Sequence, residues 1–286
     1  MPFVLLLIAL ALTLAGLALW QASDVRADRR AMDRLRARQP AAPARFDPAL
    51  VASLPEPARR YFTFAIAPGT PLRTVAEIHM TGRFRLGSGE AARDLAMRAH
   101  QVLGAPEGFV WRMAARRGVL CLSGSDGLAD GTSWTRFRML GLFPLAHLGG
   151  TEDHGRSAFG RLAAEAVFWT PAAVLPGPGV TWEPVDDDTA RVTLSHAGLP
   201  QSVDVTVDAE GRPVRVVFPR WSDADPERTY RLQPFGGDLS AFRDFGGFRL
   251  PTHVEAGNFY GTAAYAPFFL VDVTEVTFPA SGPAAR

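Results

Sequence analysis

A single segment with helical periodicity lies in the middle of a chain that otherwise alternates like β-strand, and it constrains the fold more than any other feature. Across residues 159–169 the apolar positions fall at helical spacing and form one stripe. The residues of this stripe are Phe159, Leu162, Ala163, Ala166 and Val167. Ser157 can cap the start of the helix, and Pro171 ends it because proline cannot donate the helical hydrogen bond. An apolar helix among strands needs a sheet to cover it, so we predict a curved sheet that holds this helix against its inner face.

Runs with a period of two residues flank the predicted helix on both sides. In residues 75–86, Ile78 and Met80 share one face while Glu77 and His79 share the other. The same alternation continues in residues 95–99, 109–113, 119–129, 133–142, 190–195, 203–207, 214–218, 248–256 and 268–278. Such patterns are typical of an antiparallel sheet with one solvated face. The expected fold class is mainly β (α+β): a curved, half-barrel-like antiparallel sheet with a central helix in its concavity.

An apolar run stands at the start of the sequence. Residues 3–20 are interrupted only by Thr13 and Gly16. As a helix this run spans roughly 27 Å, close to the thickness of a bilayer core, with Trp20 at the interface. A cleaved signal peptide is the alternative, but no basic stretch precedes the run and its apolar core is long. We expect residues 1–22 to be an N-terminal transmembrane helix that holds the chain in the cell membrane as a single-pass anchor.

The segment after the apolar run is basic. We interpret residues 23–49 as a juxtamembrane stalk and linker, in which Arg26, Arg30, Arg34 and Arg38 recur every four residues. This stripe either rests on anionic lipid headgroups or belongs to a solvated stalk. By the positive-inside rule, the charges after the apolar run place the following domain in the cytosol.

The rest of the chain is interpreted as one β-rich domain, residues 50–279, opened by a short helix at 54–64 and followed by a tail, residues 280–286. Residues 1–40 carry a net charge of +3 and the remainder carries −2, so the domain is nearly neutral. A neutral domain argues against nucleic acid as a partner. Cys121 is the only cysteine, which excludes an intramolecular disulfide and a cysteine-rich metal site.

The motifs of common catalytic and cofactor sites are missing from the sequence. There is no Gly-x-Ser-x-Gly nucleophile elbow, no phosphate-binding loop and no dinucleotide fingerprint. The six histidines are scattered, and the nearest approach to a metal-ligand set is Glu-Asp-His at residues 152–154. We interpret that set as a polar approach to the helix. We expect no metal and no cofactor, and we favour a protein that is not an enzyme.

Small and aromatic residues on and around the predicted helix suggest a pocket. A tightly filled core favours larger side chains than the helix alanines, and space left in an apolar concavity is either a void or a site. The candidate ligand-lining residues are Trp111, Trp134, Phe159, Ala163, Ala166, Trp169, Trp221 and Tyr260. The alternative interpretation is that these residues fill a solid core.

A set of polar residues can converge near the same helix. Its members are Arg161, Glu165, Arg220, Asp238 and His253. Arg161 and Glu165 lie four residues apart and can pair on one helix face. The set forms either a carboxylate-binding or acid–base site, or an ion-pair network that seats the helix.

Several motifs stand out from the strand pattern. They are Leu-Pro-Glu-Pro-Ala-Arg-Arg-Tyr at residues 54–61, the central helix with its proline-rich exit, Pro-Arg-Trp at 219–221, Pro-Phe-Gly-Gly at 234–237 and Phe-Gly-Gly-Phe-Arg-Leu-Pro at 245–251. Together they resemble an uncharacterised bacterial family, DUF6544, over about residues 50–279. The resemblance implies no known activity. The order of elements is also similar to the half-barrel of periplasmic lipoprotein carriers, which hold acyl chains between a curved sheet and its helices; that analogy implies a periplasmic or outer location.

Three functional hypotheses follow. The favoured one is a membrane-anchored protein that binds a lipid or another apolar ligand beside the central helix. The second is a structural or interaction protein of the cell envelope with a solid core. The third is a hydrolase in which Asp238 and His253 activate a water molecule.

Overall fold

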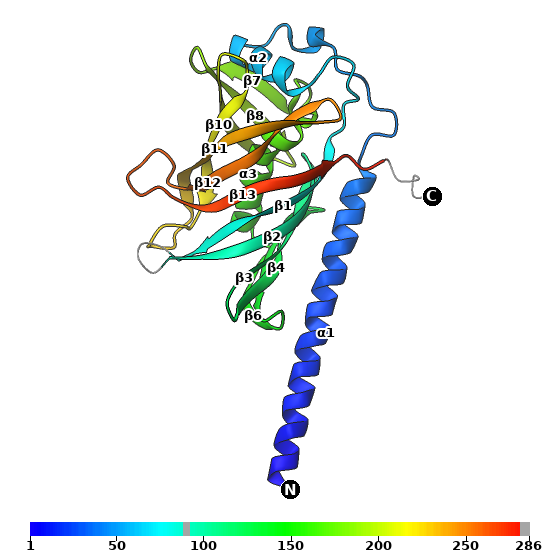
Figure 1. The fold of residues 1–286 in the computed structure, drawn as a ribbon, viewed down its shortest axis with the longest axis vertical. Helices are drawn as coiled ribbons and strands as arrows, with labels where there is room; N and C mark the ends of the chain where they lie inside the picture. Colours follow the sequence, from blue (N-terminus) through cyan, green and yellow to red (C-terminus); the bar gives the residue numbers. More distant parts are fainter. Residues whose placement is uncertain (88–91, 281–286) are drawn as a thin grey trace.

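The computed structural model describes residues 1–87 and 92–280 and contains one antiparallel sheet of thirteen strands (Figure 1). The α-helices are α1 (Pro2–Ala37), α2 (Glu56–Ala65) and α3 (Glu152–Trp169), and short 3₁₀ helices lie at Pro48–Val51 and Pro171–Val174. The strands are β1 (Val75–Leu86), β2 (Arg93–Gly104), β3 (Gly108–Arg117), β4 (Leu120–Ala129), β5 (Thr132–Met139), β6 (Phe143–Gly149), β7 (Val180–Pro184), β8 (Thr189–His196), β9 (Leu199–Val207), β10 (Pro213–Ser222), β11 (Arg231–Phe245), β12 (Phe248–Asn258) and β13 (Ala266–Thr277). The predicted tail lies outside the described residues except for residue 280.

The strand order shows how the sheet is built. It runs β6-β5-β4-β3-β2-β1-β13-β12-β11-β10-β9-β8-β7, so β1–β6 form one meander and β7–β13 form a second. The first and last strands, β1 and β13, pair in the middle and join the two meanders. α3 connects the edge strands β6 and β7, and therefore crosses the inner side of the sheet from one edge to the other. The predicted curved antiparallel sheet with a helix in its concavity is confirmed (Figure 1).

The alternation in the sequence turns one apolar face of the sheet inward. In β1, Ile78 and Met80 are buried in the main core, whereas Glu77 and His79 lie half-buried on the outer face. β6 is the exception, because almost all of its residues are exposed. An edge strand without a buried face carries no alternation, so the sequence pattern did not predict it.

α3 is longer than the predicted helix. It begins at Glu152, and Thr151 caps it by accepting a hydrogen bond from an N–H of the first turn. The predicted cap at Ser157 is therefore wrong, and Ser157 lies inside the helix. The helix ends at Trp169 and a 3₁₀ turn starts at Pro171, so the predicted stop is confirmed.

The environment of α3 is apolar on nearly all sides. Leu162, Val167 and Trp169 have no exposed surface, and the helix contacts strands of both meanders. α2 covers one end of it: the Tyr61 hydroxyl donates a hydrogen bond to the Val167 carbonyl near the end of α3. Together, the two helices cover the apolar inner face that an open sheet would otherwise expose.

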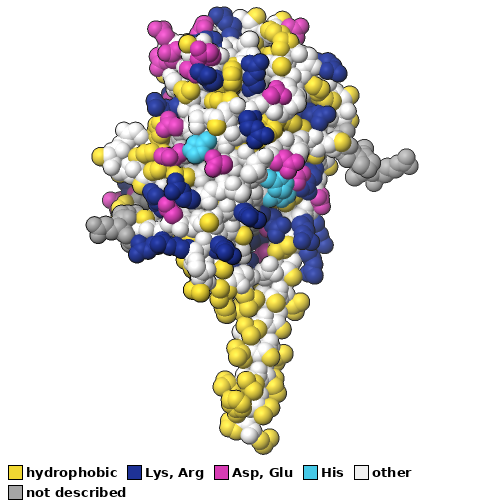
Figure 2. Space-filling model, in the orientation of Figure 1, with side chains coloured by type: hydrophobic (Ala, Val, Ile, Leu, Met, Phe, Trp, Pro, Cys, Tyr) yellow, Lys and Arg dark blue, Asp and Glu magenta, His cyan; other side chains and the backbone are white. Residues whose placement is uncertain are grey.

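α1 is one continuous helix with two different halves. Its most apolar 18-residue window has no buried residue, projects away from the domain, and is long and apolar enough to cross a membrane, a property that a signal sequence shares (Figures 1 and 2). The second half packs on the outer face of the sheet, where Met32 and Leu35 join Val102 and Trp134 in a small buried cluster. Part of the predicted stalk is thus helix docked on the sheet.

Charged pairs also fix the second half of α1. Arg36 donates hydrogen bonds of 2.7 and 3.0 Å to the two carboxylate oxygens of Glu77. The His100 Nε2 atom lies 2.6 Å from Glu77 Oε1. The hydrogen bonds from Arg36 hold the pKa of Glu77 below its ordinary value, although burial acts in the opposite direction.

Truncation of Leu162 tests the packing of α3. Leu162→Ala leaves a hole between α3 and the sheet, so we expect the free energy of unfolding to fall by about 2–5 kcal/mol. Leu232→Ala is the matched control, because Leu232 is 53% exposed and its loss should cost no more than about 0.5 kcal/mol. Chemical denaturation of the full chain measures both values. Equal losses in the two variants would contradict the buried position of α3.

The pairing of Glu77 with Arg36 predicts an acid-sensitive contribution to stability. Because the folded pKa of Glu77 lies below its unfolded value of about 4.3, the stabilisation is present above that pH and is lost as the pH falls through the folded pKa. We expect the difference in unfolding free energy between the native chain and Glu77→Gln to shrink below about pH 4. Denaturation at a series of pH values measures it. A difference that does not change with pH would contradict the pairing of Glu77 with Arg36.

Candidate functional site

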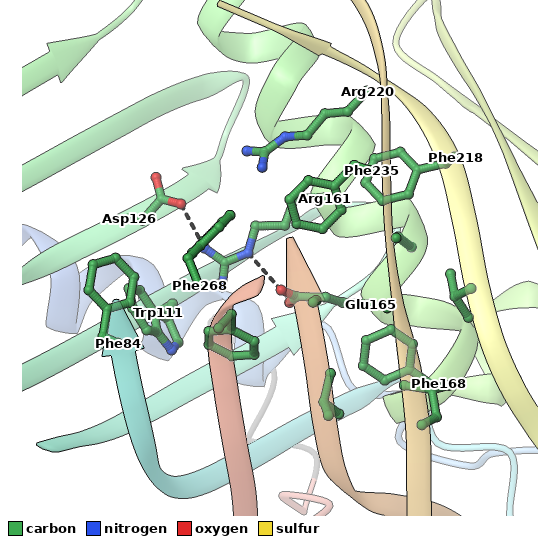
Figure 3. Close-up of a pocket in the computed structure, with 18 of the residues that line it drawn as sticks. Phe84, Trp111, Asp126, Arg161, Glu165, Phe168, Phe218, Arg220, Phe235 and Phe268 are labelled. Atoms are coloured by element: carbon green, nitrogen blue, oxygen red, sulfur yellow. Dashed lines mark hydrogen bonds and ion pairs between the residues drawn. The ribbon is translucent and has the colours of Figure 1, made fainter. Parts of the chain in front are cut away.

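A cavity of about 180 Å³ lies between the inner face of the sheet and α3 (Figure 3). Strands from both meanders contribute to its wall, and α3 contributes Ala164, Glu165 and Phe168. Aromatic rings make up much of the lining; they include Phe84, Trp111, Phe168, Phe218, Phe235 and Phe268. The cavity is therefore an apolar space at the junction of the two halves of the sheet.

The rings that line the cavity pack against one another in edge-to-face arrangements. The Phe268 ring centroid lies 6.0 Å from those of Phe84 and Phe235, with interplanar angles of 80° and 71°. Trp111 and Phe218 are buried, whereas Phe84, Phe235 and Phe268 are half-buried. The lining is therefore buried at Trp111 and Phe218 and partly exposed at these three phenylalanines.

Two consecutive glycines of β11, Gly236 and Gly237, line part of the wall with backbone atoms. A Cβ atom on Gly237 would lie 2.5 Å from the Glu255 carbonyl oxygen, and one on Gly236 would lie 2.8 Å from the Val216 carbonyl oxygen. Neighbouring strands approach too closely there for any larger residue. The Pro-Phe-Gly-Gly motif therefore supplies one aromatic ring, Phe235, followed by a bare stretch of wall.

A buried ion-pair network forms the polar side of the cavity. Arg161 on α3 donates from Nη1 to Asp126 at 2.7 Å and from Nε to Glu165 at 2.6 Å. Thr135 donates to the other oxygen of Asp126 at 2.7 Å, and Gln101 donates to the other oxygen of Glu165 at 2.5 Å. Each carboxylate oxygen thus receives a hydrogen bond.

Electrostatics keep Arg161 charged in this network. Burial acts to lower the pKa of its guanidinium, but the nearby carboxylates of Glu165 and Asp126 outweigh burial and raise the pKa above its ordinary value. Arg161 therefore neutralises two carboxylates inside the molecule and links α3 to β4.

Arg220 is the second guanidinium at the cavity, and its situation differs. Within the described residues it makes no hydrogen bond or ion pair, and its buried Nε atom has no partner. Its guanidinium carbon lies 5.0 Å from the centroid of the Phe235 ring. Burial lowers the pKa of Arg220, and the attraction of Asp126 offsets only part of that effect. Figure 3 shows the Arg220 guanidinium directed towards the space beside Asp126 and Arg161.

The structure brings some of the predicted site residues together at this cavity. Trp111 lines it among the predicted aromatic and small residues, and Arg161, Glu165 and Arg220 line it among the predicted polar residues. Four others on α3 are buried in the core outside the lining; they are Phe159, Ala163, Ala166 and Trp169. Trp134 lies on the outer face, packed against α1.

The remaining predicted residues lie away from the cavity. Trp221 donates to Asp153 at 2.7 Å, and Tyr260 donates to Asp238 at 2.7 Å. His253 Nδ1 lies 2.7 Å from Asp272. Among the described residues, Asp238 and His253 share no hydrogen bond, so they do not form the acid–base pair that the hydrolase hypothesis needs.

Several lining residues were not predicted from the sequence, although one signal marks the polar ones. Asp126 occupies an inward position of β4, on the same face as Leu122 and Leu128. Gln101 interrupts the inner face of β2 in the same way, as Arg220 does after Phe218 in β10. A polar residue at an inward-facing strand position is costly unless it is paired, and such interruptions mark sites.

A second cavity, of about 380 Å³, lies between α1 and the outer face of the sheet. Asp24 and Asp28 of α1 line it opposite Arg112, Arg136 and Arg138, with which they form ion pairs. Beside it, the ligand atoms of Glu77, His79 and His100 lie within 4.8 Å of one another. Arg36 of α1 already donates two hydrogen bonds to Glu77, so the carboxylate of this group is bonded to α1.

The Glu-Asp-His set at residues 152–154, interpreted from the sequence as a polar approach to the helix, lies in the first turn of α3. His154 lies 2.7 Å from the Ser133 hydroxyl through Nδ1 and 3.1 Å from the Thr135 hydroxyl through Nε2. Burial lowers the pKa of His154. Its two ring nitrogens therefore connect α3 to β5.

Replacement of Arg161 tests the network. Arg161→Met removes the cation that is bonded to the buried carboxylates of Asp126 and Glu165, so we expect the free energy of unfolding to fall by about 3–5 kcal/mol. The additional change Glu165→Gln should recover part of this loss. Arg191→Met is the control, because its pair with Asp204 is partly exposed and should contribute at most about 1 kcal/mol. Denaturation curves that show equal losses for Arg161→Met and Arg191→Met would contradict the buried network.

Comparison with known proteins places the chain in a family. A search of curated proteins gives no match. Two solved structures are similar: a LolA superfamily protein from Nitrosomonas europaea (10% identity, TM-score 0.38, covering 78% of this chain and 91% of that one) and a domain assigned to outer membrane lipoprotein sorting from Vibrio parahaemolyticus (9%, 0.37, 73% and 87%). These similarities carry no inference about ligand or role. The model of DUF6544, a family of unknown function, matches residues 44–270, and the chain belongs to that family.

Proposed function

We propose that the domain binds an apolar ligand, an acyl chain, in the cavity between the sheet and α3. The observation that carries this proposal is the aromatic-lined cavity of about 180 Å³. An apolar cavity of about 150 Å³ stays dry and binds benzene, so a space of this size and lining can take an apolar ligand. In a filled core, larger side chains would occupy the space beside Ala164 and beside the backbone of Gly236 and Gly237.

The size of the cavity limits the ligand. Its volume lies below the roughly 300 Å³ at which drug-sized ligand pockets begin. The cavity therefore fits a short acyl chain or the end of a longer one. The half-buried rings of Phe84, Phe235 and Phe268 stand where the remainder of a longer chain would leave the protein.

The apolar half of α1 supports a location at a lipid surface. This half has the length and composition of a single-pass membrane anchor, and it is continuous with the half that packs on the sheet. As an uncleaved anchor, α1 would hold the domain beside the bilayer, which is a source of acyl chains.

The other two hypotheses have less support. The hypothesis of a structural protein with a solid core predicts no cavity beside α3. A hydrolase based on Asp238 and His253 lacks their mutual contact in the described structure, because each is bonded to a different partner on the outer face.

Filling the cavity tests the proposed function. Ala164→Phe places a ring in the cavity, so we expect about a tenfold or greater loss of affinity for a fluorescent fatty acid, measured by titration of the full chain in nanodiscs. Ala96→Phe, at an exposed position of β2, is the matched control and should bind as the native chain does. Unchanged affinity in Ala164→Phe, with the fold intact by circular dichroism, would place the ligand elsewhere.

A further inference from the structure

We propose that the ligand of this cavity is an acidic amphiphile, a single acyl chain with a carboxylate headgroup, and that Arg220 binds the carboxylate. This inference rests on the proposed function, because it names the chemical class of the ligand that the cavity takes. Its basis is the state of the charged groups around the cavity.

The carboxylates at the cavity do not use Arg220. Asp126 receives hydrogen bonds from Thr135 and Arg161, and Glu165 receives them from Arg161 and Gln101. All four carboxylate oxygens are thus bonded without Arg220. The ion pairs of the network are complete within the protein.

Arg220 is left with its full hydrogen-bonding capacity. A guanidinium carries five N–H donors in a planar fork that matches a carboxylate in bidentate geometry. In Arg220 the Nε atom is buried and unpartnered, and no bond from this side chain to another described residue is found. A buried donor without a partner is costly, and an anionic ligand would remove that cost.

The aromatic part of the cavity lining begins next to Arg220. The Arg220 guanidinium lies over the Phe235 ring, and the Phe235 ring contacts that of Phe268, which contacts that of Phe84 (Figure 3). Arg220 lies two residues after Phe218 on β10 and lines the same space. A carboxylate at Arg220 would therefore have its hydrocarbon tail beside a continuous row of rings.

The charge and volume of the site define the ligand further. Arg220 is the one guanidinium in the lining that has no carboxylate bonded to it among the described residues, so it matches a single anionic group. A cavity of about 180 Å³ has room for one chain rather than two. A cationic headgroup would meet the positive charge of Arg220 and should be rejected.

Three ligands that share one hydrocarbon tail and differ in the headgroup separate the contribution of the headgroup to the affinity from that of the tail. Octanoate, octanol and octylammonium are titrated by calorimetry into the full chain in nanodiscs, with empty nanodiscs of the same lipid as the blank. A charge-assisted hydrogen-bonded pair predicts that octanoate binds about ten- to hundredfold more tightly than octanol, and that octylammonium binds more weakly than octanol. Equal affinities for octanoate and octanol would overturn the headgroup assignment and leave the proposed apolar site standing.

Variants of Arg220 assign the effect to this residue. Arg220→Gln should lower the affinity for octanoate to about that for octanol, and a circular dichroism spectrum that matches the native chain shows that the variant is folded. Arg220→Lys should retain part of the preference, because it keeps the charge without the planar fork. A preference for octanoate that persists in Arg220→Gln would overturn the role of Arg220. Absence of binding by all three ligands to the native chain would instead contradict the proposed function itself.

Discussion

The packing of α3 into the concave side of the sheet is the interaction on which the rest of the structure depends. Each meander has an apolar inner face, and α3 is the connection between their outer edges, so one helix covers both. Leu162, Val167 and Trp169 are completely buried by this arrangement. The cavity is the part of the concavity that α3 does not fill, on the side of Ala164 and Phe168.

The charged groups beside the cavity differ in whether they are bonded to one another. Arg161, with Asp126 and Glu165, forms a closed network that links α3 to the strands. Arg220 stands beside that network without a bonded partner. The same wall thus contains one set of charges that the fold satisfies and one guanidinium that the fold leaves available.

Much of the fold could be predicted from local patterns, because periodicity reports which residues face a core. The alternation in β1 and the apolar stripe of α3 both correspond to buried faces. The site was harder to predict than the fold. The predicted residues Arg161, Glu165, Arg220 and Trp111 do meet at the cavity, but Asp238 and His253 face outward on β11 and β12. Register and sheet curvature decide such meetings across distant strands, and neither is visible in a single sequence.

A crystal structure of the chain with bromine-terminated octanoate tests the central claim most directly, because the anomalous signal of bromine locates the end of the tail. We predict a bromine peak inside the cavity, beside the rings of Phe268 and Phe84 that continue the row from Phe235, with the carboxylate density at Arg220. A bromine peak on α1 or in the outer cavity, with the space between α3 and the sheet left without ligand density, would contradict the account.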